Sequence, residues 1–332
     1  MTKIYLTSPF WWCKLHQEND YSRSCLNPLM KSKSKYMKGL GLKTISVLLI
    51  FWTLKSITLG QIVNPENITI YRDGVILKGK FYIAEGQGLF PTLLLLQGFP
   101  GNQTDVIGLG KILSQSGINV MTFNFSGTHQ SDGTCSFENS QLDIMAAVEF
   151  LYYPENIVRF NIDTSLIVLG GYSFGGGMGM TYAIRHPEIK HVITIAGNDW
   201  GSFFEEYIRN PELKNTTDAN IDRAVSTGIT RFEKGGMPRE IAEVGIDKLD
   251  PAFFLRKSAS QLTTKNILII CGLDDDTSYD FILPLYRELK KEGAQNVQIT
   301  ALQDDHSFLK TRTDLANAVI MWIKAIPEGQ KQ

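Results

Sequence analysis

Continuous apolar runs alternate with helical stretches through most of this sequence, and this alternation constrains the fold more than any other feature. Two strands, expected at 67–71 and 75–82, flank an Asp-Gly hairpin signal, and apolar runs follow at 92–96, 118–123, 165–169, 192–195, 267–271 and 297–302. Continuous apolar strands are typical of a parallel sheet that is buried on both faces. Helices are expected between them at 105–116, 140–152, 175–185, 279–291 and 313–326. The pattern predicts an α/β fold with a mostly parallel central sheet flanked by helices.

One long segment interrupts this alternation. From residue 198 to about residue 264 there is no strong strand signal, only charged and aromatic helical stretches such as 203–208 and 221–232. A segment of this length is far too long for a plain connection between a strand and the next helix. We therefore expect a helical cap inserted at about 199–264 into a single domain that spans residues 61–332.

The first 60 residues differ in charge from the rest of the chain, with a net charge of +7 against -8 for residues 61–332. An apolar run at 44–54 is too short to cross a bilayer, which takes about 20 residues, but it has the length of a secretory signal core. We expect residues 1–60 to be a leader with a signal-like segment at 37–60, cleavage near Gly60, and export. The initiator is then Met37, and residues 1–36 are an upstream extension. An uncleaved N-terminal membrane anchor is the alternative.

Charge and cysteine content exclude several other classes of function. The acidic balance of residues 61–332 offers no bulk attraction to nucleic acid. Outside the leader the cysteines are Cys135 and Cys271, and their pairing is left open by the sequence. No Cys/His cluster has the spacing of metal ligands, so a zinc site is not expected.

The most specific motif is a G-x-S-x-G sequence, Gly171-Tyr-Ser173-Phe-Gly175, that follows the buried strand at 165–169 and opens a helix. This context is typical of a nucleophile elbow, a sharp strand-turn-helix turn that presents a serine hydroxyl above the sheet. A glycine-rich turn before a helix can alternatively bind phosphate. We predict that Ser173 is a nucleophile.

A serine nucleophile needs a base, and the sequence has only five histidines. His16 lies in the leader, whereas His186 and His191 flank a helix end and a strand start and are expected to be structural. His129 follows a strand on the side of the elbow and is a candidate for the substrate pocket. His306 follows the last strand, where a side chain reaches the carboxyl edge of the sheet, and is the predicted base.

The base in turn needs a carboxylate that fixes its tautomer. Three acids follow the strand at 267–271, and spacing from Gly272 favours Asp275, with Asp274 and Asp276 as alternatives. The resulting order along the chain is Ser, Asp, His. Two backbone N–H groups are expected to form an oxyanion hole, one from Phe174 after the nucleophile and one from Phe99, since Pro100 has no N–H.

From about residue 67 to residue 326 the chain resembles the α/β-hydrolase superfamily, most of all its serine aminopeptidase-like and dienelactone-hydrolase-like branches. The motifs that carry the resemblance are QGFPG at 97–101, NFSGTHQSDG at 124–133, GYSFGG at 171–176, GLDDD at 272–276 and DHSF at 305–308. The resemblance implies serine-dependent hydrolysis through an acyl-enzyme, without a cofactor. The sequence departs from the family pattern at Gln97, where His is common, and at Ser126 and His129, which replace Arg and Gly. Details of the pocket are therefore not carried over.

The expected activity is hydrolysis of a carboxylic ester or amide in a small molecule or peptide. Two alternatives remain: an exported peptidase or aminopeptidase acting on short peptides, and a non-catalytic binding member of the fold. Cap aromatics, Trp200 and Phe203 together with Phe204 and Tyr207, are expected either to form an apolar pocket wall or to pack the cap onto the body. No nucleic-acid partner is expected, and a membrane is expected only through an uncleaved leader.

Overall fold

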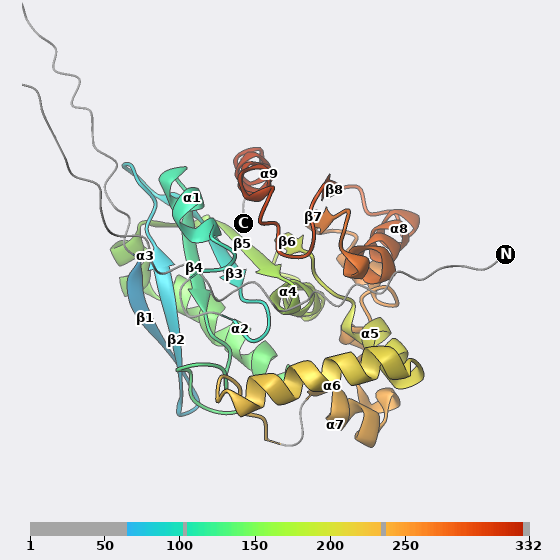
Figure 1. Ribbon diagram of the computed structural model, residues 1–332. Coiled ribbons are helices and arrows are strands. Elements are labelled where there is room, and N and C mark those ends of the chain that lie inside the picture. The colour runs from blue at the N-terminus through green and yellow to red at the C-terminus, as the bar shows by residue number, and fades with distance from the viewer. Residues whose placement is uncertain (1–64, 102–104, 234–236, 328–332) are drawn as a thin grey trace, which may run out of the picture. The chain divides into compact units, whose positions relative to one another are not determined.

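A single mixed sheet forms the centre of the computed structural model, which describes residues 65–101, 105–233 and 237–327 (Figure 1). Eight strands in this part of the chain are ordered β1-β2-β4-β3-β5-β6-β7-β8. Their bounds are β1 Glu66–Arg72, β2 Val75–Tyr82, β3 Phe90–Leu96, β4 Asn119–Phe123, β5 Ile162–Tyr172, β6 His191–Ile195, β7 Asn266–Gly272 and β8 Val297–Leu302. The pairs β1–β2 and β2–β4 are antiparallel, and every other pair is parallel. The predicted mostly parallel sheet with an antiparallel start is confirmed.

The hairpin between β1 and β2 follows from its two turn residues. Asp73 and Gly74 both have positive φ, 45° and 81°, which a two-residue turn of this twist requires and which Asp-Gly adopts readily. The turn sets the register, in which Arg72 pairs with Val75 and Glu66 pairs with Phe81.

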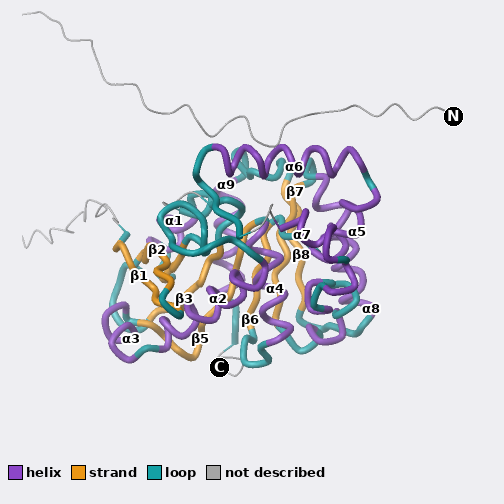
Figure 2. Tube along the Cα trace, turned by 90° about the horizontal axis from the view of Figure 1, so that it is seen from below, coloured by secondary structure: helices purple, strands orange, loops and turns teal. Residues whose placement is uncertain are grey.

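Helices cover both faces of the sheet, which is why the central strands are apolar along their whole length (Figures 1 and 2). One face packs on α1 (Leu109–Gln115) and α9 (Arg312–Lys324), and the other packs on α2 (Phe137–Tyr152), α3 (Pro154–Phe160), α4 (Phe174–Arg185) and α8 (Leu283–Lys291). In β3, Leu93 and Leu95 pack in the apolar core on the face covered by α1 and α9, whereas Leu94 and Leu96 pack in the core on the opposite face. Because successive side chains of a strand point to opposite faces, one strand contributes to both cores.

The connection from β6 to β7 is helical. It holds α5 (Trp200–Arg209), α6 (Pro211–Ser226), α7 (Met237–Val244) and three short 3-10 helices at Ile246–Lys248, Pro251–Phe253 and Ala259–Leu262, within the segment expected to be a cap. In Figure 1, α6 crosses the lower part of the view, beside α5 and α7. The expectation of a helix through residue 232 was wrong, because α6 ends at Ser226 and Gly228 has a φ of 72°. Thr230 then forms a β-bridge with Thr128 instead of continuing the helix.

Other helices also differ from the expectation. Residues 105–108 lie outside α1, where Gly108 has a φ of 73° and the Asp105 carboxylate accepts a hydrogen bond from the Gly110 N–H. A π-helical turn, Ser278–Ile282, precedes α8. The helix α3, which has Pro154 at its start, was not expected. Proline suits the first turn of a helix because the N–H it lacks has no partner there.

The predictions for the leader, including its cleavage site, lie outside the described residues. In the described part of the chain, no helix combines the length and apolarity needed to cross a membrane. Cys135 and Cys271 are both buried and carry free thiols. Burial, with a contribution from the charge of Asp275, raises the pKa of the Cys271 thiol to about 11.

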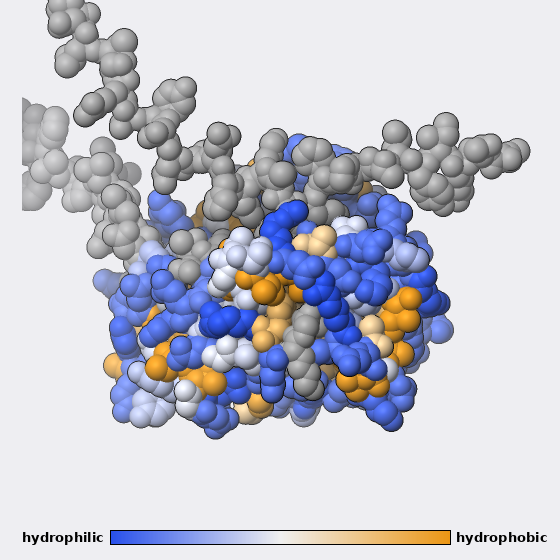
Figure 3. Space-filling model, turned by 60° about the horizontal axis from the view of Figure 1, so that its bottom comes forward, coloured by the Kyte–Doolittle hydropathy of each residue, from blue (hydrophilic) through white to orange (hydrophobic). Residues whose placement is uncertain are grey.

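The surface seen in Figure 3 is mostly hydrophilic, and its hydrophobic side chains gather in separate patches, one of them near the centre of the view. Among the described residues, the most exposed large apolar side chains are Val158 on α3, Tyr71 on β1 and Met321 on α9. Exposed apolar side chains of this kind are ordinary on a folded protein and carry no functional argument by themselves.

Candidate active site

Ser173 stands at the turn between β5 and α4, in a backbone conformation that few residues adopt, with φ 51° and ψ −113°. The flanking glycines make this turn possible. A Cβ atom at Gly171 would lie 2.3 Å from the carbonyl carbon of Gly175, and one at Gly175 would lie 2.6 Å from the carbonyl oxygen of Gln97. The strand-turn-helix context that the G-x-S-x-G motif predicted is therefore present, and strain of this kind is often concentrated at functional sites.

The structure brings together the predicted nucleophile, base and acid. Nε2 of His306 lies 2.9 Å from Oγ of Ser173, and Nδ1 of His306 lies 3.0 Å from Oδ2 of Asp275. With the neutral ring protonated on Nδ1, His306 donates to the carboxylate and accepts from the serine hydroxyl. The three residues follow β5, β7 and β8, whose carboxyl ends lie at one edge of the sheet because these strands are parallel.

Only one of the three consecutive acids reaches the imidazole. Asp275 is 2% exposed, and its carboxylate also accepts hydrogen bonds from the Thr277 N–H at 3.2 Å and from the Ser278 hydroxyl at 3.1 Å. Asp274 and Asp276 are exposed, and Asp274 accepts a hydrogen bond from the Gln303 side chain. The spacing from Gly272 pointed to the acid that the structure places beside His306.

A second buried carboxylate, to which no sequence motif points, holds the loop that carries His306. Asp304 is fully buried, and its Oδ2 accepts the N–H groups of Lys310 and Thr311, each at 2.8 Å, and the Thr311 hydroxyl at 3.0 Å. Its Oδ1 accepts the Asp305 N–H at 2.9 Å. Burial by itself raises the pKa of Asp304, but these hydrogen bonds outweigh it and lower the pKa below its usual value. Two adjacent acids before the histidine are visible in the sequence, but nothing there shows which one is buried.

Tyr172, the residue before Ser173, also contacts His306. The hydroxyl of Tyr172 donates to the carbonyl oxygen of His306 at 3.0 Å, and the two rings are 5.2 Å apart between centroids. Burial, followed by the negative charge of Asp275, raises the pKa of Tyr172, so its hydroxyl stays protonated and able to donate. The elbow and the loop after β8 are thereby joined at a second point.

The residues predicted to supply the oxyanion donors are Phe174, directly after the serine, and Phe99, in a loop near the elbow. Phe174 is the first residue of α4, so its N–H has no carbonyl one turn earlier in the helix to bond. The loop at 97–101 passes close to the elbow: the Gly175 N–H donates to the Gln97 carbonyl at 3.0 Å, and a Cβ at Gly98 would lie 3.5 Å from Cβ of Ser173. The Phe99 and Phe174 rings are in contact, with centroids 6.1 Å apart.

Aromatic side chains extend from these two residues into the cap. The Trp200 ring packs on those of Phe174 and Phe203, with centroid separations of 5.3 Å and 5.6 Å, and both Trp200 and Phe203 are half-buried. Phe204 and Tyr207 are fully buried, so of the two expected roles the burial of these rings fits packing within the protein rather than a pocket wall. The sequence missed Phe232, whose ring stacks on that of Phe99, because that stretch was expected to be helical.

His129, the other candidate pocket residue, lies in the loop after β4 and has a positive φ of 48°. Its backbone N–H donates to the Ile229 carbonyl at 2.7 Å, so the residue marks a contact between this loop and the cap segment.

A buried ion pair anchors the same loop. The Arg72 guanidinium lies 2.8 Å from the Asp143 carboxylate, which also accepts the N–H and the hydroxyl of Ser126, each at 2.7 Å. Burial raises the pKa of Asp143, and the hydrogen bonds of Ser126 and the charge of Arg72 oppose that rise. Ser126 stands where the resembled family has an arginine, and here Arg72 of β1 brings a guanidinium to the Ser126 hydroxyl, at 3.0 Å.

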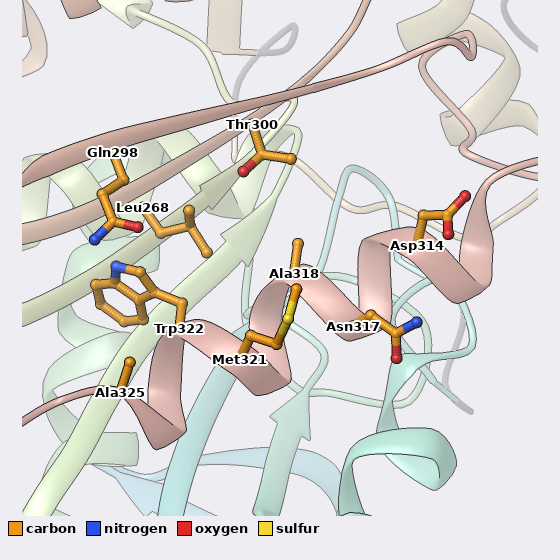
Figure 4. Close-up of a pocket in the computed structure, with 9 residues that line it drawn as sticks. All are labelled: Leu268, Gln298, Thr300, Asp314, Asn317, Ala318, Met321, Trp322 and Ala325. Atoms are coloured by element: carbon orange, nitrogen blue, oxygen red, sulfur yellow. The ribbon is translucent and has the colours of Figure 1, made fainter.

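A separate groove lies between β7, β8 and α9 (Figure 4). Leu268 and Thr300 line it from the sheet, and Met321 and Trp322 line it from the helix. None of its lining residues is among Ser173, Asp275 and His306. In the described part of the chain, no group of three or more His, Cys, Asp or Glu side chains is arranged to hold a metal ion.

The chain is similar in sequence to several known proteins. A family model described as "alpha/beta hydrolase fold" matches residues 91–220. Cutinase 2 of Thermobifida cellulosilytica is 26% identical over 214 residues, which cover 62% of this chain and 78% of that protein. Cutinase cut1 of Thermobifida fusca is also 26% identical over 214 residues, and the match covers 62% of this chain but only 64% of that protein.

Solved structures agree with this fold. A fungal esterase from Rhizomucor miehei superposes with a TM-score of 0.59 at 16% identity, covering 79% of this chain and 83% of the esterase. An esterase from Pyrobaculum calidifontis superposes with a TM-score of 0.57 at 18% identity, covering 80% and 87% of the two chains. At these identities the likeness concerns the fold alone.

Proposed function

We propose that this chain, a hydrolase with the α/β-hydrolase fold, is a serine esterase that cleaves carboxylic esters through an acyl-enzyme. The observation that carries the proposal is the hydrogen-bonded series Ser173–His306–Asp275 at the carboxyl edge of the sheet. Similarity to cutinases supports an ester rather than an amide as the substrate.

The chemistry follows from the contacts. Nε2 of His306 takes the Ser173 hydroxyl proton as Oγ attacks the ester carbonyl, and the backbone N–H groups of Phe99 and Phe174 stabilise the negative charge that forms on the carbonyl oxygen. When this tetrahedral intermediate collapses, the bond to the alcohol breaks and the alcohol leaves with the proton from His306. Water, deprotonated by the same nitrogen, then attacks the acyl-enzyme and releases the acid and the serine. Asp275 holds the imidazole in the required tautomer and stabilises its charged form.

The surroundings of the serine favour an apolar acyl group. Phe99, Trp200, Phe203 and Phe232 are half-buried aromatic residues that connect the elbow to the cap. Partly exposed rings of this kind gain free energy by covering an apolar substrate.

A fluorophosphonate probe and a substrate panel test the proposal. We expect the probe to label the wild-type protein at Ser173, and Ser173→Ala to lose both labelling and hydrolysis of p-nitrophenyl acetate. A folded wild-type protein that is not labelled would instead indicate a non-catalytic binding protein. Faster cleavage of a peptide anilide than of the matched ester would indicate a peptidase.

We also propose that the enzyme is exported, on the basis of its basic leader with an apolar core at 44–54. N-terminal sequencing of protein recovered from the medium or periplasm should find Gln61 as the first residue. Recovery of the full-length chain in the membrane fraction would favour the anchor.

A further inference from the structure

The segment that leads from α6 to α7 is joined by backbone hydrogen bonds to the loop after β4. The His129 N–H donates to Ile229, the Arg231 N–H donates to Gly127, and the Cys135 N–H donates to Arg231, each at 2.7 Å. We call residues 229–231 and 127–135 together the clasp. Because its bonds are short strand-like pairings around the Thr128–Thr230 bridge, the clasp fixes this part of the cap to the body of the enzyme.

Arg231 and Gly127 allow the two halves of the clasp to bind each other closely. The Arg231 guanidinium donates to the carbonyl oxygens of His129 and Ser131, across about 100 positions of the sequence. Gly127 has a φ of 72°, and a Cβ there would lie 2.3 Å from the Cys135 nitrogen and 2.5 Å from the Arg231 oxygen. Any side chain at Gly127 would therefore push the two halves of the clasp apart.

Phe232, the residue directly after the clasp, contacts the loop that carries a proposed oxyanion donor. Its ring stacks on that of Phe99 with centroids 6.1 Å apart and an interplanar angle of 27°. The Phe99 ring also contacts that of Phe174, whose N–H is the other proposed donor. The side chain of Phe99 is thus held by one ring from α4 and one ring from the cap.

We propose that Phe232 is a positioning residue for ester hydrolysis: held by the clasp, it fixes Phe99 and so aims the Phe99 N–H at the oxyanion. The proposal rests on the proposed function of the site. An oxyanion donor acts only when it is held close to its productive position, and removal of one donor costs about 100-fold to 1,000-fold in kcat. Partial misplacement of the Phe99 N–H should therefore lower kcat for every ester, whatever its acyl chain.

A purely lining role for Phe232 predicts a different pattern. If the ring only contacts the acyl chain, its loss should raise KM for long-chain esters and leave hydrolysis of an acetate ester unchanged, because acetate is too short to reach a distant wall. Measurement of kcat and KM on a short and a long ester therefore shows whether Phe232 positions Phe99 or only lines the pocket.

The experiment compares Phe232→Ala, Phe232→Leu and Phe232→Tyr on p-nitrophenyl acetate and p-nitrophenyl octanoate. We expect the Ala and Leu variants to lose about 10-fold or more in kcat on both esters, with KM on the acetate within about twofold, and the Tyr variant to keep most of the wild-type kcat because it keeps the ring. Unchanged kcat on the acetate in the Leu variant would overturn the proposal, as would a change confined to KM on the octanoate.

A second pair of variants tests the clasp without changing Phe232. Gly127→Ala should reproduce the fall in kcat on the acetate, whereas Arg223→Ala, which removes an exposed arginine of α6, should not. Circular dichroism establishes that each variant is folded. A folded Gly127→Ala protein with wild-type kcat would overturn the role of the clasp. If fluorophosphonate fails to label the wild-type protein, the proposed function fails and this inference fails with it; if it labels the wild type and Phe232→Leu is equally active, only the inference fails.

Discussion

Nε2 of His306 and Oγ of Ser173 are 2.9 Å apart, although 133 positions separate the two residues in the chain. The strand order explains how they meet. The strands β5 and β8 are separated by β6 and β7, so the loop after β8 has to reach back along the carboxyl edge of the sheet. Asp304 folds that loop on itself, and the Tyr172 hydroxyl binds the His306 carbonyl from the other side. The imidazole position therefore depends on buried polar contacts outside the three central residues.

The three consecutive acids after β7 provide a matched test of the proposed triad. Asp275→Asn should lower kcat by about 10,000-fold, because an amide at this position favours the wrong imidazole tautomer. The exposed neighbours should tolerate the same change, so Asp274→Asn and Asp276→Asn are expected to stay within about twofold of wild type. Steady-state hydrolysis of p-nitrophenyl acetate measures all three. A large loss in Asp274→Asn with an active Asp275→Asn would contradict the assignment.

The loop that carries His306 provides a second test. In Asp304→Asn the side-chain amide either turns its NH₂ group toward the two N–H groups at Lys310 and Thr311 or leaves them with a weaker, neutral acceptor. We expect the variant to lose about 1–3 kcal/mol of unfolding free energy and to have a lower kcat with little change in KM. The matched control is Asp305→Asn, which changes an exposed carboxylate that accepts hydrogen bonds from the Ser307 N–H and hydroxyl. Equal behaviour of the two variants in urea unfolding and in kcat would show that burial of Asp304 is irrelevant.

The glycines of α4 and its elbow differ in what a methyl group would meet. Gly171→Ala should destabilise the fold severely or prevent it, since the added Cβ would lie 2.3 Å from backbone atoms of Gly175. Gly179→Ala, in the same helix, should be neutral or stabilising by up to about 1 kcal/mol, because its nearest contact is an ordinary 3.5 Å and alanine favours a helix. Soluble expression and thermal unfolding compare the two. An equally stable Gly171→Ala protein would mean that the elbow can relax.

Much of the fold could be read from the sequence, because buried parallel strands have to be apolar along their length. The run at 192–195 lies in β6 and the run at 267–271 lies in β7, each of which extends it by one or two residues. Helix ends were predicted less well. The start of α1 depends on a positive φ at Gly108, and the end of α6 depends on a bridge from Thr230 to a loop about 100 positions earlier. Such tertiary contacts override local helical periodicity, and the amino-acid pattern carries no sign of them.

For the candidate site too, some residues could be predicted from the sequence and others could not. Ser173, Asp275 and His306 could be found because each follows a strand, and strand ends in a parallel sheet meet at one edge. Asp304 and Phe232 could not, since their roles depend on which of two acids turns inward and on how the cap returns to the body. Neither relationship has a local signal.

The carboxylate of Asp105, just before α1, makes the stability of the fold depend on pH. Burial raises the pKa of Asp105 to about 6, although hydrogen bonds from the backbone N–H groups of Gly110, Val106 and Lys111 and the charge of Arg312 oppose that rise. The folded protein therefore binds this proton more tightly than the unfolded chain, whose aspartate pKa is about 3.9. The contribution of Asp105 to stability is thus fully present below about pH 4 and is lost as the pH rises to about 6.

Asp105→Asn isolates this contribution, because the amide oxygen can still accept the Gly110 hydrogen bond without carrying a charge. We expect the variant and the wild type to have similar unfolding free energies near pH 4, and the variant to be more stable by roughly 1–2 kcal/mol at pH 7, a value that allows for partial exposure of the carboxylate. Urea unfolding of both proteins at pH 4, 5, 6 and 7 measures the difference. If the variant were instead less stable at pH 7, the attraction between the Asp105 carboxylate and Arg312 would outweigh the cost of its burial, and the charged carboxylate would stabilise the folded protein.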